Sequence, residues 1–335
     1  MGTSRRLREL ARSLGERARF PDQPAVVALS GGADSAACAW LARAAGLTVR
    51  AVHVHHRLPA SDRLEEAAGA VAGSLDLDFD SLRLDAAPRS ETHGRVSRHR
   101  ALEAALQAGE ALLTGHTRDD QAETVLANLL RGSGVDGLAG IPARRGPIVH
   151  PLLGVWRTET RELATLAGLP WFDDPTNADD TALRNRIRRS LIPALEAGFQ
   201  PNLRDVLART AEHAAGDARA LDDLAGAIRP VPAPGGGVRL ALGALMAAGP
   251  ALGGRAIRSA ATLLAPPYPP GSAGLDRVWR VVTGQDRATQ LAGGLTARRA
   301  GPWLELRASD GTSTRQRASL PDDIEEDWVW PTSGN

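Results

Sequence analysis

The stretch with the strongest chemical character is Ser30-Gly31-Gly32-Ala33-Asp34-Ser35, called the phosphate loop below. Two glycines let backbone N–H groups approach a phosphate closely, the serine hydroxyls add donors, and the start of a following helix favours an anion. The loop lacks the lysine of the Walker pattern and does not fit the dinucleotide fingerprint. Asp34 would repel a bare phosphate, which predicts a bridging cation such as Mg²⁺. The alternative is a tight turn in which Asp34 or Ser35 caps a helix.

A second group of polar residues lies in the segment 114–124 and combines an imidazole with two carboxylates. If a helix begins near Thr117, then His116, Asp120 and Glu123 fall on one side of its first turns. Such a set could hold Mg²⁺, position a nucleotide and move protons. The alternative is structural, because Thr117 and Asp120 have the spacing of a capping box and acids are favoured in a first turn by the helix dipole.

Two further polar segments follow, and one of them is strongly basic. A glycine-rich loop, 130–138, leaves the same predicted helix, and a second segment runs from Asp173 to Asn177. Beyond it, four arginines occur within residues 184–189 and could bind phosphates in pairs of hydrogen bonds. The alternative is a solvated helix whose arginines pair with Asp179, Asp180 and Glu196.

The elements that must position these residues alternate between short apolar runs and helical patterns. The runs are 25–29, 49–54, 79–84 and 111–114, and a helix is expected over 4–18. This alternation predicts an α/β fold with a doubly wound, Rossmann-like parallel sheet covered on both faces. Ligands bind beyond the carboxyl ends of the strands in such sheets, so the loops after Leu29, Val54 and Thr114 should form the site.

The strand signal fades after about residue 151. Helices are expected over 158–169, 183–195 and 201–228, a linker over 230–237, helices over 240–248 and 275–282, and strands over 295–297 and 303–306. We therefore expect a first domain over 1–200, with its helical part at about 151–200. A connecting helix over 201–230 and a small C-terminal α/β domain over 231–335 follow.

Composition excludes several classes of protein. The 335 residues carry a formal net charge of +1, so any nucleic-acid surface must be local. Cys38 is the single cysteine, which excludes an internal disulfide and an all-cysteine metal site. The first twenty residues lack the apolar core of a signal peptide, and no segment has the length of a membrane span. We expect a cytoplasmic protein with no membrane partner.

The phosphate loop is similar to the pyrophosphate-binding loop of the ATP pyrophosphatases (PP-loop superfamily), which adenylate a carbonyl oxygen and release pyrophosphate. Together, the four segments over about 25–200 resemble the tRNA(Ile)-lysidine synthetases. The resemblance implies a ligase that forms a carbon–nitrogen bond. Such an enzyme adenylates carbon 2 of the wobble cytidine in isoleucine tRNA with a CAU anticodon, then joins L-lysine to give lysidine, AMP and pyrophosphate.

The resemblance also implies roles for particular residues. Residues 1–200 are then the ATP-binding catalytic domain. ATP and Mg²⁺ are the expected co-substrate and cofactor, with Mg²⁺ on Asp34 and Asp120. The implied catalytic residues are Asp34, His116, Asp120 and Glu123. The implied ATP-binding residues are Ser30, Gly31, Gly32, Ala33, Asp34, Ser35, His53, Arg95 and Arg98. The side that faces tRNA or lysine is expected to include Arg131, Gly132, Ser133, Asn177, Arg184, Asn185 and Arg188. The C-terminal domain is expected to bind tRNA, and a homodimer is an open expectation.

The sequence departs from the family pattern at two positions and ends where longer members continue. Arg57 stands where the family usually has glycine, and His99 stands where it has an aromatic residue. We expect the short form. Alternatives are a tRNA-thiolating enzyme, which the lone Cys38 disfavours, an amidating enzyme of the same superfamily, and a noncatalytic tRNA- or nucleotide-binding relative.

Overall fold

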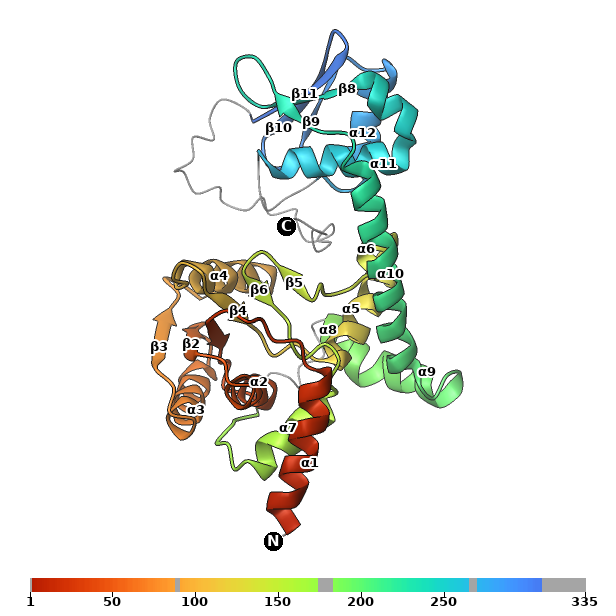
Figure 1. Ribbon diagram of the computed structural model, residues 1–335. Coiled ribbons are helices and arrows are strands. Elements are labelled where there is room, and N and C mark those ends of the chain that lie inside the picture. Colours follow the sequence, from red (N-terminus) through yellow and green to blue (C-terminus); the bar gives the residue numbers. More distant parts are fainter. Residues whose placement is uncertain (1, 88–90, 174–182, 265–269, 309–335) are drawn as a thin grey trace. The chain divides into compact units, whose positions relative to one another are not determined.

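The computed structural model describes residues 2–87, 91–173, 183–264 and 270–308. These residues form two compact units, each considered by itself. Unit 1 comprises residues 2–134 and 138–212, and unit 2 comprises residues 135–137 and the described residues after 212 (Figure 1). Among the helices of the described residues, none combines the length and the apolarity that crossing a membrane requires.

Unit 1 is built on a six-stranded sheet in the order β3-β2-β1-β4-β6-β5. Its pairs are parallel except for β5 and β6, which are antiparallel. The expected parallel sheet is therefore confirmed, and the two-residue strands β5 and β6 are an addition to it. The strands are β1 (Ala25–Ala28), β2 (Val49–His55), β3 (Phe79–Arg83), β4 (Ala111–Leu113), β5 (Arg144–Arg145) and β6 (Ile148–Val149).

Helices cover both faces of this sheet (Figure 1). Val27 packs on one face with Leu41 of α2, whereas Val26 packs on the other with Leu102 of α4. Because successive strand residues point to opposite faces, a strand buried on both sides is apolar throughout, as the sequence of β1 is. The helices between the parallel strands are α2 (Ala33–Ala44), α3 (Ser61–Ser74) and α4 (Glu91–Ala104).

The remaining helices of unit 1 begin with α1, before the sheet, and continue after β4. Of these, α7 packs against both α1 and α2. Helix α10 starts in unit 1 and continues into unit 2. These helices are α1 (Gly2–Arg17), α5 (Arg118–Leu130), α7 (Arg157–Leu166), α8 (Leu183–Arg186), a π-helical turn (Ile187–Leu191), α9 (Ile192–Gly198) and α10 (Leu203–Ala225). The short helix α6 (Val135–Leu138) consists mostly of the residues 135–137 that belong to unit 2.

Unit 2 has its own core between an antiparallel sheet and two helices. Leu240 and Leu304 of the sheet pack with Ile257 of α11 and Val281 of α12, and all four are fully buried. The sheet order is β7-β8-β11-β10-β9. Its elements are β7 (Val231–Pro232), β8 (Val238–Ala241), α11 (Leu242–Thr262), α12 (Ser272–Thr283), β9 (Ala288–Leu291), β10 (Leu295–Ala300) and β11 (Trp303–Ala308).

Two expectations for this unit are wrong in part. The expected linker over 230–237 contains β7, which pairs with β8 and tolerates Pro232 because it is an edge strand. The helix expected from residue 240 begins at Leu242, since residues 238–241 pair with β11 as a strand. A short apolar run fits either structure, and its pairing with a distant strand decides between them.

Candidate active site

The phosphate loop connects β1 to α2 in a conformation that requires its first glycine. Gly31 has a φ of +87°, and a Cβ there would collide with the backbone carbonyl of Leu64. Ser35 ties the loop together, since its Oγ lies 3.0 Å from the Oγ of Ser30 and donates to the carbonyl of Gly32 at 2.9 Å. Gly31 is therefore required both for its positive φ and for the absence of a side chain.

The same loop leaves the start of α2 open. Gly32 is the N-cap, and no side chain caps the first turn of the helix. Uncapped N–H groups at a helix start, together with the helix dipole, form a binding site for an anion. The residues therefore fit the phosphates of ATP.

The second predicted group lies at the start of α5, where the capping box expected as the structural alternative is present. Asp120 Oδ2 accepts the backbone N–H of Thr117 at 2.7 Å and the Thr117 hydroxyl at 2.9 Å. Its other oxygen, Oδ1, contacts Arg157 and Arg184 at 2.7 Å each. Asp120 thus caps the helix with one oxygen and binds guanidinium groups with the other.

His116 lies just before this helix and is half-buried. Its Nδ1 lies 2.8 Å from the hydroxyl of Thr114, and its ring centroid lies 4.9 Å from that of His150. Its hydrogen bond to the end of β4 places the imidazole beside the segment that carries Asp120.

The two predicted groups approach each other at neighbouring strand ends, because β1 and β4 are paired. A Cβ added to Gly115 would lie 2.8 Å from the backbone of Asp34 and from the nitrogen of Ser35. The absence of a side chain at Gly115 is therefore what lets the segment after β4 lie against the phosphate loop.

Arg157, which the sequence analysis did not single out, joins the two groups. Its Nε lies 3.4 Å from Asp34, its Nη2 lies 2.7 Å from Asp120, and its Nη1 lies 3.1 Å from Glu123. Thr160, one turn later on α7, is fully buried, and its hydroxyl donates a hydrogen bond to Asp34. The sequence held no signal for this role, since Arg157 is one arginine among many and lies outside every recognised motif.

Arg184 and Arg188 contact the same acids from α8 and the π-helical turn. Arg184 Nε lies 2.9 Å from Glu123, and Arg188 Nε lies 2.6 Å from Glu123. These two arginines thus differ from both sequence interpretations, a free phosphate-binding stripe and a solvated helix. Glu196, one of the expected partners, pairs instead with Arg204, and Asp179 and Asp180 lie outside the described residues.

Burial and the arginines give the three carboxylates different proton affinities. Burial raises the pKa of Asp34 to about 6, although Arg157 and Thr160 act in the opposite direction. Burial acts in the same way on Asp120, but Arg184 and Arg157 outweigh it and lower the pKa of Asp120 well below its ordinary value. For Glu123, Arg188 and Arg184 likewise outweigh burial and lower the pKa.

The predicted Mg²⁺ site on Asp34 and Asp120 does not fit this arrangement. Arg157 contacts both carboxylates at once, and Mg²⁺ requires near-octahedral oxygen ligands at about 2.1 Å. A cation bound by both acids would have to displace the guanidinium. The carboxylates as arranged bind an arginine.

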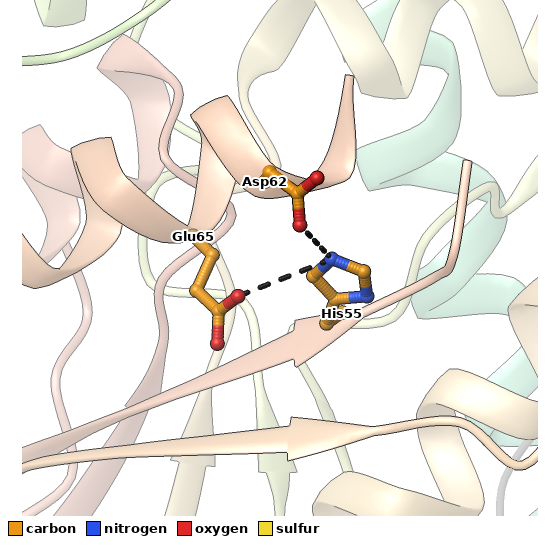
Figure 2. A group of neighbouring side chains, drawn as sticks. All are labelled: His55, Asp62 and Glu65. Carbon is orange, nitrogen blue, oxygen red and sulfur yellow. Dashed lines mark hydrogen bonds and ion pairs between the residues drawn. The ribbon is translucent and has the colours of Figure 1, made fainter. Parts of the chain in front are cut away.

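A different group of side chains, His55, Asp62 and Glu65, has the donor atoms of a metal site (Figure 2). The Nδ1 of His55 accepts the backbone N–H of Arg57 at 3.2 Å, so in a neutral ring Nε2 carries the proton that it donates to Asp62 at 2.9 Å. Glu65 is held by Arg83 at 2.9 Å. Hydrogen bonds and ion pairs thus account for this cluster.

Two histidines in and directly after β2 have lowered pKa values. His53 is buried, and its Nδ1 lies 2.8 Å from the carbonyl of Leu29. Burial lowers the pKa of His53, and burial together with Arg98 lowers the pKa of His56 to about 4. Arg57 adopts a φ of +60°, so the backbone conformation that favours glycine is present although the residue is arginine.

The other predicted residues are more dispersed. Arg131 and Gly132 are exposed after α5, and Ser133 is half-buried there. Asn185 is half-buried on α8. Arg95 lies on α4, but its side chain, like Asn177 as a whole, lies outside what the structure describes.

Comparisons with known proteins concern the family and the fold of the chain. Residues 3–195 match the family model described as a PP-loop domain. The chain is 42% identical over 303 residues to a tRNA(Ile)-lysidine synthase from Salinispora arenicola, which covers 84% of this chain and 90% of that protein. It is 40% identical over 251 residues to one from Leifsonia xyli, which covers 71% of this chain and 76% of that protein.

A solved structure shares the fold. It is the U34-tRNA thiolase NcsA from Methanococcus maripaludis with its [4Fe-4S] cluster, at a TM-score of 0.51 and 17% identity, covering 62% of this chain and 78% of that one. At this identity the likeness concerns the fold alone. The PP-loop match over more than half of the chain and the relatives that span most of it show the family. The chain belongs to the tRNA(Ile)-lysidine synthases, a family built on the PP-loop domain.

Proposed function

We propose that this chain is an ATP-dependent ligase that forms lysidine on isoleucine tRNA with a CAU anticodon. The observation that carries the proposal is that the phosphate loop and the acidic start of α5 meet at neighbouring strand ends, where Arg157 contacts an acid from each. An anion site for ATP and a set of carboxylates for the second substrate thus lie together. The lysidine synthase relatives support the choice of reaction.

In the first step, the O2 carbonyl oxygen of the wobble cytidine attacks the α-phosphate of ATP, and pyrophosphate leaves. The open start of α2 and Ser35 would hold the departing pyrophosphate through N–H and O–H donors. His53, Arg95 and Arg98 are proposed to complete the ATP site. The cytidine must leave its stack to reach the sheet edge, which is typical of recognition in single-stranded loops of RNA.

In the second step, the ε-amine of lysine attacks carbon 2 of the cytidine and expels AMP. The amine must be neutral, although free lysine has a pKa of about 10.4, so a base has to take its proton. Among the carboxylates, Asp34 suits this role best, because its pKa is raised to about 6 while those of Asp120 and Glu123 are lowered. His116 is the second candidate, from its position beside α5.

The remaining site residues are proposed to act on lysine or tRNA. They are Arg131, Gly132, Ser133, Asn177, Arg184, Asn185 and Arg188. The C-terminal domain, expected over residues 231–335, is proposed to bind tRNA as well. Because the substrates are ATP, lysine and tRNA, the proposed reaction belongs in the cytoplasm.

Two parts of the proposal depend on tests of their own. Mg²⁺ is proposed as the ion that accompanies ATP. The test measures the rate of lysidine formation at increasing concentrations of Mg²⁺. A homodimer is a prediction that light scattering of the purified protein checks.

The direct experiment supplies the protein with ATP, Mg²⁺, radiolabelled lysine and isoleucine tRNA bearing a CAU anticodon. We expect label in the RNA and one AMP released for each lysine joined. Label that enters RNA from a sulfur donor or from ammonia instead would refute the proposal. Cys38 already argues against sulfur chemistry, since it is fully buried and burial raises the pKa of its thiol to about 12.

A further inference from the structure

Helix α7 contributes to the site although neither sequence motif includes it. Arg157 is its first residue, and its backbone N–H donates to the carboxylate of Asp119 at 2.8 Å. The side chain is only 16% exposed. Both the backbone and the guanidinium of Arg157 are therefore fixed against the start of α5.

The geometry of Arg157 suits it to joining three carboxylates at once. Each of its three guanidinium nitrogens contacts a different acid: Nε contacts Asp34, Nη2 contacts Asp120 and Nη1 contacts Glu123. A planar guanidinium presents five N–H donors in a fixed arrangement, which the single ammonium of lysine cannot reproduce. The charge at this position also separates carboxylates that would otherwise repel one another.

Arg184 and Arg188 do not duplicate this role. Within the described residues, Arg184 and Arg188 form ion pairs with Asp120 and Glu123 of α5, whereas Arg157 forms the ion pair with Asp34 of the phosphate loop. Thr160, from the same helix, adds a hydrogen bond to the other oxygen of Asp34. Asp34 is thus oriented by two side chains of α7.

We propose that Arg157 and Thr160 are positioning residues for the reaction, because they fix Asp34 relative to Asp120 and Glu123. The inference rests on the proposed function and deepens it. Catalytic groups must be held within a fraction of an ångström of their working geometry, and a displacement of about 1 Å can cost about 100-fold in rate.

The test compares variants of α7 in lysidine formation, with kcat expressed per ATP-binding site so that unfolded protein is not counted. We expect Arg157→Lys, which keeps the charge but loses the planar group, to lower kcat by about 100-fold with little change in the KM for ATP. Matched controls lie one turn further along the same helix. Arg161→Lys and Thr165→Val should leave kcat unchanged, since Arg161 pairs with the exposed Asp173 and Thr165 bonds to backbone.

A second pair of variants keeps the test decisive if Arg157→Lys does not fold. Thr160→Val removes the hydroxyl with little change of shape and should lower kcat, and Thr160→Ser should restore it. Wild-type kcat in Arg157→Lys or Thr160→Val, or no recovery in Thr160→Ser, would overturn the inference. If the unaltered chain forms no lysidine, the proposed function fails. The same variants are then compared in pyrophosphate release from ATP, which tests the positioning role of Arg157 and Thr160 independently of lysidine formation.

Discussion

At the scale of single residues, the site divides its carboxylates into two kinds. Burial keeps the pKa of Asp34 near 6, so it can exchange a proton near neutral pH. Asp120 is tied to Arg157, Arg184 and a helix cap, and it stays ionised. Acids with opposite environments in one site commonly have different roles, one in proton transfer and one in electrostatic stabilisation.

Replacing Asp34 tests whether its carboxylate is also needed in the first step, which precedes the proton transfer from lysine. We expect Asp34→Ala to abolish pyrophosphate release while the fold stays intact, because the loop backbone is held by Gly31 and Ser35 and not by this side chain. Release is measured with a coupled pyrophosphate assay and the fold by circular dichroism. Asp62→Ala, at an acid that is 84% exposed, is the control. Retained release would exclude Asp34 from the first step, and lysidine formation at the wild-type rate would remove it from the catalytic residues.

His56 gives a prediction for stability against pH. Burial, together with Arg98, lowers its pKa to about 4, compared with 6.5 when exposed. Between these values the unfolded chain binds more protons than the folded one, so the contribution of His56 to folding is lost as pH falls from about 6.5 to 4. In His56→Gln, the free energy of unfolding should fall less between pH 7 and pH 5, as measured with urea. Protonation of Asp34 changes the stability in the opposite direction, so the fall in the free energy of unfolding is compared between His56→Gln and the wild-type protein. An equal fall in both proteins would contradict the prediction.

At the scale of elements, strand–loop–helix junctions place the site, and these were the most predictable features. The runs at 25–29 and 111–114 became β1 and β4 because strands covered on both faces must be apolar along their whole length. The start of α5 was predictable from the spacing of Thr117 and Asp120. The contribution of α7 was not, because contacts such as Arg157 to Asp34 span 123 residues and leave no local pattern.

The junction after β4 can be tested at Gly115. A methyl group there would lie 2.8 Å from the backbone of Asp34, so Gly115→Ala must push the phosphate loop away from α5. We expect pyrophosphate release to fall by about 100-fold, as for other displacements of about 1 Å. Gly73→Ala is the matched control, since a Cβ at Gly73 on α3 meets no atom within 4 Å. Equal activity in both variants would show that the close approach is not required.

At the scale of the whole molecule, two separate cores account for the two units. The core of unit 2 includes Leu245, which is fully buried, and all of its members lie in residues 228–306. The sequence indicated a small C-terminal module and two of its strands, β10 and β11, but not the five-stranded sheet, because the other three strands have four residues or fewer and are too short to show a pattern of their own.

Separate cores predict separate unfolding. Leu245→Ala should cost about 2–5 kcal/mol in the stability of unit 2, through lost burial and a cavity. In a calorimetric scan, we expect the transition of unit 2 to move to lower temperature and that of unit 1 to stay in place. A single transition that moves as a whole would show that the two units unfold together.

The residues 135–137 belong to unit 2 although both of their flanking segments belong to unit 1. Asp136 in this insertion pairs with Arg255 and Arg258 of α11. A protease that cuts α10 after Glu212 would leave Asp136 in one fragment and both arginines in the other. The ion pairs of Asp136 would therefore still join the two fragments. We expect the fragments to co-elute at low ionic strength and to separate more readily in concentrated salt, which screens such pairs.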